Sequence, residues 1–215
     1  MYIGRIVSVA KTPDDRIVAA YRVSSRSFPN RKAVITDTQV SIVPKEGHEG
    51  DIHKNPYIAY NCVRIINDNQ IAVVTNGSQT DPIAEKIIQG MFIRDALILA
   101  STTLDYEKDD YNTPRVSAVA DRSTNTGWLA VVRDNGLEVR QMPLEPGKFF
   151  YVATYEENSI SLDQSGDYDA ASAPEACEYI IGKGVFAERE KPVTAVAAVA
   201  TTDGFDLATK DVAQE

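Results

Sequence analysis

The feature that most constrains the fold of this sequence is a change in hydrophobic period near Asn76, with strand-like segments on both sides of it. Runs rich in β-branched residues and separated by short turns fill residues 2–75 and return at residues 115–155. Between them, Ile83, Ile87 and Met91 follow one another at helical spacing. Two strand regions around a helical one predict an α+β fold, in which antiparallel sheets carry helices on their outer faces.

The same patterns predict individual elements. We expect strands at residues 2–10, 16–25, 33–43, 57–66, 70–75, 115–120, 127–133, 137–142 and 149–155, and helices at 80–90, 94–106 and 174–182. A polar loop is expected at 44–56. The run 192–202 is either a buried strand or a tightly packed helix, since its small residues suit both. We expect one domain over residues 1–215, with residues 203–215 as a partly disordered tail.

The net charge of the whole chain and the local charge of one segment have opposite signs. The chain has 22 Lys and Arg against 31 Asp and Glu, so its formal charge is −9, which repels phosphate backbones and anionic membranes. We therefore expect neither a nucleic acid nor a membrane as partner. Residues 16–36, however, hold five basic residues and no acidic one. This segment either binds an anion or is a solvated strand end, and its lack of interleaved acids favours an anion site.

Within that segment, YRVSSRSFPNR (residues 21–31) combines three arginines with three serines. Arginines bind phosphate or carboxylate through paired hydrogen bonds, which serine hydroxyls can complete. On chemistry, we expect a phosphate to be bound by Arg22, Ser24 and Arg26. The turn NGSQTD (76–81) before a helix can also present backbone amides to an anion, although plain helix capping is the stronger interpretation. Asn76 and Gly77 are therefore weaker candidates.

Acidic residues gather in DYEKDDYNTPR (105–115), at the end of the second expected helix. The helix dipole favours cations at that end, so carboxylates such as Glu107 and Asp109 stand there against a local preference. This hints at function, although an exposed acidic loop is the favoured interpretation from the residues alone. Tyr57 and Tyr60 lie near a strand, and a place in the core is the favoured interpretation for both.

Several kinds of site find no support in the sequence. Cys62 and Cys177 have no metal or redox spacing and are expected to be buried thiols, while His48 and His53 fall in a polar segment. No catalytic motif such as GxSxG or HExxH is present, and two histidines give no credible Ser/His/Asp triad. No stretch approaches eighteen consecutive apolar residues, and no signal peptide is evident. We expect a cytoplasmic protein without metal or cofactor.

Long strings of the sequence resemble the archaeal-type IMP cyclohydrolase family, in order over nearly the whole chain. They include MYIGR (1–5), YRVSSRSFPNR, EGHE (46–49), NPYIAYNC (55–62), NGSQTD, DYEKDDYNTPR, TYE (154–156) and KPVTAVAA (191–198). The resemblance implies an enzyme that closes the purine ring of formamido-imidazole-carboxamide ribotide (FAICAR) to inosine monophosphate with loss of water, the last step of purine nucleotide synthesis. It also implies a four-layer α-β-β-α sandwich of antiparallel sheets, similar to the N-terminal nucleophile hydrolases. We also expect a homo-oligomer.

The resemblance assigns catalysis to Arg31, Tyr60 and Glu107. Arg31 would polarise oxygen, and Tyr60 and Glu107 would relay protons between the carboxamide nitrogen and the leaving hydroxyl. The chain begins Met1-Tyr2 and so lacks the terminal Ser, Thr or Cys nucleophile of that fold family. A cyclohydrolase needs none, because its substrate carries its own nucleophile. The missing nucleophile argues against an amidohydrolase of the same fold, and the three catalytic residues argue against a non-catalytic purine-nucleotide-binding protein.

Overall fold

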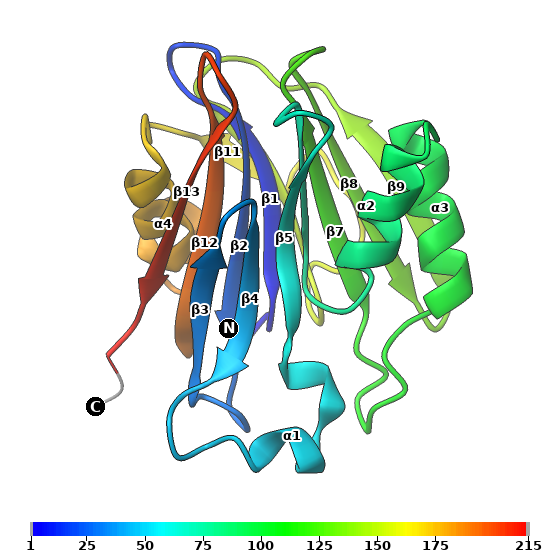
Figure 1. Ribbon diagram of the computed structural model, residues 1–215. Helices are drawn as coiled ribbons and strands as arrows, with labels where there is room; N and C mark the ends of the chain where they lie inside the picture. Colours follow the sequence, from blue (N-terminus) through cyan, green and yellow to red (C-terminus); the bar gives the residue numbers. More distant parts are fainter. Residues whose placement is uncertain (1, 214–215) are drawn as a thin grey trace.

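Two antiparallel sheets lie face to face in the computed structural model, which describes residues 2–213 (Figure 1). The six-stranded sheet has the order β11-β10-β1-β2-β12-β13 and the seven-stranded sheet the order β3-β4-β5-β6-β7-β8-β9. The first sheet consists of β1 (Ile6–Lys11), β2 (Ile17–Ser24), β10 (Lys148–Ala153), β11 (Ser165–Asp167), β12 (Pro192–Ala200) and β13 (Phe205–Asp211). The second consists of β3 (Arg31–Thr36), β4 (Gln39–Pro44), β5 (Tyr60–Ile66), β6 (Ile71–Thr75), β7 (Arg115–Asp121), β8 (Thr126–Arg133) and β9 (Gly136–Met142).

Helices cover the outer face of each sheet (Figure 1). The helices on these faces are α2 (Thr80–Ile88), α3 (Ile93–Leu104) and α4 (Ala173–Gly182). The one-turn helix α1 (Asp51–Lys54) lies at one end of the sandwich instead, and short 3-10 turns form η1 (Pro56–Ile58) and η2 (Gly184–Phe186). Ile180 of α4 packs on the six-stranded sheet, whereas Ile83 of α2 and Leu97 of α3 pack on the seven-stranded one. A third apolar cluster fills the space between the sheets. The α+β prediction is confirmed, and the layers run helix, sheet, sheet, helix.

Strand β12 shows why the run at 192–202 is a strand. Its alternate residues Val196, Ala198 and Ala200 face the core between the sheets, and the residues between them, Ala195, Ala197 and Val199, face α4. A strand between two apolar layers buries both faces, so it has no polar alternation. Small side chains on both faces allow the helix and the opposite sheet to approach it closely.

The structure corrects the sequence predictions in five places. The strand expected from residue 2 begins at Ile6. Residues 33–43 are not one strand but parts of β3 and β4, joined by a tight turn at Asp37, whose φ is 49°. The strand expected from residue 57 begins at Tyr60, because Pro56–Ile58 form η1. The loop at 44–56 includes the short helix α1. The expected tail forms β13 over Phe205–Asp211, which pairs with β12, while residues 214–215 lie outside the described residues.

Candidate active site

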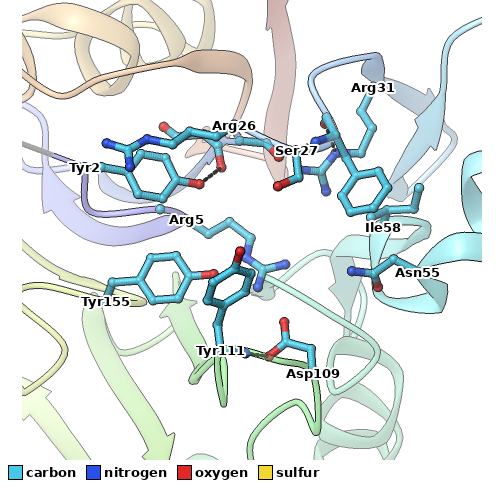
Figure 2. A pocket seen from close by; sticks show the side chains of 14 residues that line it. Tyr2, Arg5, Arg26, Ser27, Arg31, Asn55, Ile58, Asp109, Tyr111 and Tyr155 are labelled. Carbon is cyan, nitrogen blue, oxygen red and sulfur yellow. Dashed lines mark hydrogen bonds between the residues drawn. The ribbon is translucent and has the colours of Figure 1, made fainter.

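A cavity of about 260 Å³ opens at one end of the sandwich and is lined by residues from both sheets (Figure 2). The six-stranded sheet contributes the chain before β1, the segment after β2 and Tyr155 after β10. The seven-stranded sheet contributes Arg31 at the start of β3, Asn55 and Ile58 before β5, and the loop before β7. Antiparallel pairing places these strand ends at the same end of the sandwich. The cavity is therefore lined by segments that are far apart in the sequence.

One side of the cavity is a cradle of hydroxyl and guanidinium groups from residues 24–28, after β2. Arg26 is exposed, with Nη2 2.9 Å from Glu190 Oε2 and its guanidinium carbon 4.2 Å from the centre of the Tyr2 ring. An exposed ion pair contributes little stability, so Arg26 can exchange Glu190 for a ligand anion. Ser24 lines the same side, and its Oγ accepts a hydrogen bond from Arg22 Nε. The predicted phosphate ligands Ser24 and Arg26 thus lie together.

Tyrosine rings form another side of the cavity. Tyr2 and Tyr155 stack with centroids 5.8 Å apart and planes 26° apart, and Tyr111 meets Tyr155 edge-on at 6.4 Å. Figure 2 shows these three rings on one side of the view, with the guanidinium group of Arg5 to their right. Aromatic faces in this arrangement suit a flat, partly polar ligand.

Arg31 presents an unpaired donor at the cavity. Its side chain is almost fully buried, and its Nε donates to the carbonyl of Phe28 at 3.0 Å. Within the described part of the chain, Nη1 has no hydrogen-bond partner. A buried guanidinium donor without an acceptor is costly, and so Nη1 is poised for an acceptor on a ligand.

Glu107 is fully buried and paired with Arg5, which lines the cavity. Arg5 Nη2 lies 2.8 Å from Glu107 Oε2, and Arg115 Nη1 lies 3.7 Å from Oε1. Among residues 2–213, Oε1 has no hydrogen-bond partner. Burial raises the pKa of Glu107, although the charges of Arg5 and Arg115 act in the opposite direction. The interpretation of residues 105–115 as an exposed acidic loop is therefore wrong at Glu107.

Tyr60 lies beneath the cavity lining, in the core between the sheets. Its hydroxyl is 2.6 Å from that of Tyr21 on β2. Burial raises the pKa of Tyr60, and the positive charges of Arg31 and Arg5 lower it. Arg5 therefore interacts electrostatically with both Tyr60 and Glu107, and Arg31 with Tyr60. Arg5 thus links Glu107 to Tyr60, and Tyr60 links both to Arg31.

Three predicted phosphate ligands do not line the cavity. Arg22 is fully buried, and its guanidinium donates to main-chain carbonyls of the segment from α4 to β12, including those of Ile181 at 2.8 Å and Arg189 at 2.6 Å. Burial lowers its pKa to about 10. Asn76 is also fully buried, where its Nδ2 donates to Pro114 O and its Oδ1 accepts from Val116 N. Both residues join chain segments, so we do not retain them as ligands.

Gly77 is the third predicted phosphate ligand that does not line the cavity, and it lies next to Glu107. A Cβ at this position would be 2.7 Å from Arg115 Nη1 and 3.1 Å from Glu107 Oε1. A side chain here would push Arg115 and Glu107 apart, and so Gly77 permits their approach.

Sequence reasoning missed Arg5, Arg115, Tyr21 and the three tyrosines at the cavity. Most of them stand inside strings that carried the resemblance, such as Arg5 in MYIGR and Tyr155 in TYE. Gly4 was the available signal for Arg5: its φ is +69°, and a Cβ on it would approach the Tyr155 ring to 2.8 Å. Glycine is the residue that tolerates a positive φ and so close an approach of another side chain.

Three other features concern the described residues only. Cys62 and Cys177 are buried free thiols, as predicted. Within residues 2–213, no cluster of three or more His, Cys, Asp or Glu side chains is arranged to hold a metal ion. The helices in this part of the chain are all too short or too polar to span a membrane.

The cavity is lined by three arginines, Arg5, Arg26 and Arg31, and is therefore suited to a small anionic molecule. Residues 2–204 match the family model described as IMP cyclohydrolase-like protein, and the chain belongs to this family. It is 50% identical to an IMP cyclohydrolase of Methanosphaera stadtmanae over 92% of this chain and 94% of that one. It is 46% identical to an IMP cyclohydrolase of Methanococcus maripaludis, over 97% and 100% of the two chains. Identity to that of Methanocaldococcus jannaschii is 43%, over 98% and 99%.

Proposed function

We propose that this protein is an IMP cyclohydrolase, which closes the purine ring of FAICAR to give inosine monophosphate and water. Membership in the IMP cyclohydrolase-like family supports this activity. The observation at the site that supports it is that two buried atoms lack a hydrogen-bond partner among the described residues: Arg31 Nη1, a donor on a residue that lines the cavity, and Glu107 Oε1, an acceptor on the partner of the cavity residue Arg5. A formyl oxygen suits the first atom, and a carboxamide N–H suits the second.

The reaction needs positioning and proton transfer. The carboxamide nitrogen of the substrate attacks the formyl carbon and loses one proton, and the formyl oxygen becomes a hydroxyl. The formamido nitrogen then loses its proton as the C–OH bond breaks, so both protons leave with that oxygen as one water molecule. Because nucleophile and electrophile belong to one molecule, holding the reactive conformation supplies much of the acceleration.

Each catalytic residue has a role that its surroundings support. Arg31 Nη1 donates to the formyl oxygen and stabilises the negative charge that develops there. Glu107 Oε1 accepts the carboxamide proton, and its raised pKa makes it a stronger base than an exposed glutamate. Tyr60 gives a proton to the departing hydroxyl. Arg5 connects two of them, since its charge holds Glu107 in place and acts on the Tyr60 hydroxyl.

Binding of the nucleotide uses the rest of the cavity. Arg26 and Ser24, with Ser25 and Ser27 beside them, would hold the ribose phosphate by charge-assisted hydrogen bonds. The rings of Tyr2 and Tyr155 would pack against the flat imidazole. The layer order supports a further proposal, that the fold is similar to the N-terminal nucleophile hydrolases.

Turnover of FAICAR by the purified protein tests this function. We expect inosine monophosphate to form faster than in a buffer blank, as followed by ultraviolet absorption. The absence of any rate above the blank would contradict the proposed activity.

The variant Glu107→Gln tests the assigned base. The amide keeps the shape of the side chain but cannot take up the carboxamide proton, so we expect kcat to fall at least about 100-fold, within the range of general-base catalysis. Binding of inosine monophosphate, measured by calorimetry, should stay within a few-fold of the original. Asp110→Asn is the matched control, because Asp110 is an exposed carboxylate of the same loop. Loss of nucleotide binding in Glu107→Gln would make Glu107 a structural residue.

A further inference from the structure

The hydroxyl groups of Tyr21 and Tyr60 form a buried pair that bridges the two sheets. Tyr21 belongs to β2 of the six-stranded sheet and Tyr60 to β5 of the seven-stranded sheet. Their oxygens lie 2.6 Å apart, within the apolar core that fills the space between the sheets. Burying two polar hydroxyls in such a core is costly unless each satisfies the other. The hydrogen bond between the two hydroxyls therefore stabilises the pair, and Tyr60 is one of the proposed catalytic residues.

The surroundings of the pair differ between its two members. Tyr21 is fully buried, whereas Tyr60 keeps slight exposure. Burial raises the pKa of both tyrosines, and the pKa of Tyr21 is raised well above its ordinary value. A negative charge on Tyr60 raises the pKa of Tyr21 further. Arg31 and Arg5 favour ionisation of both tyrosines, whereas the hydrogen bond between the two hydroxyls lowers the pKa of Tyr60 and raises that of Tyr21. The other titratable neighbour, Cys62, stays a neutral thiol because burial raises its pKa. Tyr60 is thus the member that can give up a proton, and Tyr21 the one that keeps it.

We propose that Tyr21 is a positioning residue of the catalytic centre, whose hydroxyl donates a hydrogen bond to Tyr60 and stabilises it after Tyr60 has released its proton. This inference rests on the proposed function, in which Tyr60 protonates the departing hydroxyl. In that step the Oη–H bond of Tyr60 breaks, its electron pair stays on Oη, and the substrate oxygen leaves as water. A proton released by the substrate then restores Tyr60. Tyr21 itself undergoes no net change and does not touch the substrate.

The variant Tyr21→Phe tests this role, because it removes one oxygen and keeps the ring. We expect kcat to fall about 10- to 100-fold, as for the loss of a hydrogen bond to a charged group, with KM unchanged. Tyr168→Phe is the matched control: Tyr168 is equally buried in another cluster, on the α4 side, and its hydroxyl has no partner among the described residues. We expect this control to retain the original kcat.

A second measurement separates positioning from a merely structural role. In NMR of protein carrying tyrosine labelled at the ζ carbon, the signal of Tyr60, assigned by its loss in Tyr60→Phe, should titrate at higher pH in Tyr21→Phe than in the original protein. An unchanged kcat would overturn the proposal, and so would a lowered kcat with an unmoved Tyr60 titration. If the original protein does not turn over FAICAR, the proposed function fails, while the NMR titration still decides whether Tyr21 stabilises ionised Tyr60.

Discussion

Glu107 combines two opposing influences on one carboxylate, since burial raises its pKa while Arg5 and Arg115 act to lower it. A base must be ionised to accept a proton, so turnover should be present above this pKa and lost as the pH falls through it. Because the net effect is upward, the acid limb of kcat/KM should lie above 4.5, the ordinary value for glutamate. Removing the positive charge in Arg115→Gln should move this limb to still higher pH. A pH profile with an unmoved limb would contradict the role of Glu107 as base.

Single residues also show where sequence reasoning reaches its limit. Arg22 and Arg26 have the same chemistry and stand in the same string, yet one is buried against main-chain carbonyls and the other is exposed at the cavity. Strand alternation places Arg22 on the face of β2 that carries Ala20 toward α4, and Tyr21 on the face between the sheets. The alternation is visible in the sequence. Which face of β2 lies toward the cavity depends on the helix and the sheet that pack against it, and these are distant in the sequence.

At the scale of elements, the short segment before β1 places Arg5 through the conformation of Gly4. Its φ of +69° and the approach of the Tyr155 ring leave no room for a Cβ. Gly4→Ala should therefore lower the free energy of unfolding by about 1–3 kcal/mol and reduce kcat by displacing Arg5. Gly182→Ala, at the end of α4, is the matched control, because a Cβ there meets nothing within 4 Å. Its stability should be unchanged or raised by up to about 1 kcal/mol. Urea unfolding measures both, and equal stability of the two variants would remove the constraint on Gly4.

Elements with a clear period were predictable, and those defined by pairing were not. The helical spacing from Ile83 predicted α2, which ends at Ile88, and the strands expected at 127–133 and 137–142 are β8 and β9. By contrast, the β3–β4 turn at Asp37, whose φ is 49°, lies in a run rich in β-branched residues that contains no glycine or proline. The local sequence therefore gave no sign of this turn. Strand β13 is half-exposed and polar, and its order comes from pairing with β12. Such pairing depends on residues that local patterns do not include.

At the scale of the whole molecule, the cavity joins the two sheets, so a ligand that fills it should stabilise their packing. Inosine monophosphate at about 100 times its Kd should add about 2.7 kcal/mol to the free energy of unfolding. For a chain of this size, that corresponds to a rise in Tm of roughly 5–10 °C. The net charge of −9 opposes binding of any anion at long range, so the affinity must come from short contacts such as those of Arg26.

Arg26→Ala should therefore require a higher nucleotide concentration to reach the same shift in Tm. Arg94→Ala removes an equal charge from an exposed arginine on α3 and serves as its control, because Arg94 pairs only with neighbouring Asp95 among the ion pairs of the described chain. Thermal melting over a series of nucleotide concentrations measures both variants. Matching concentration dependence in the two variants would show that net charge, and not the contact at Arg26, governs binding of the nucleotide.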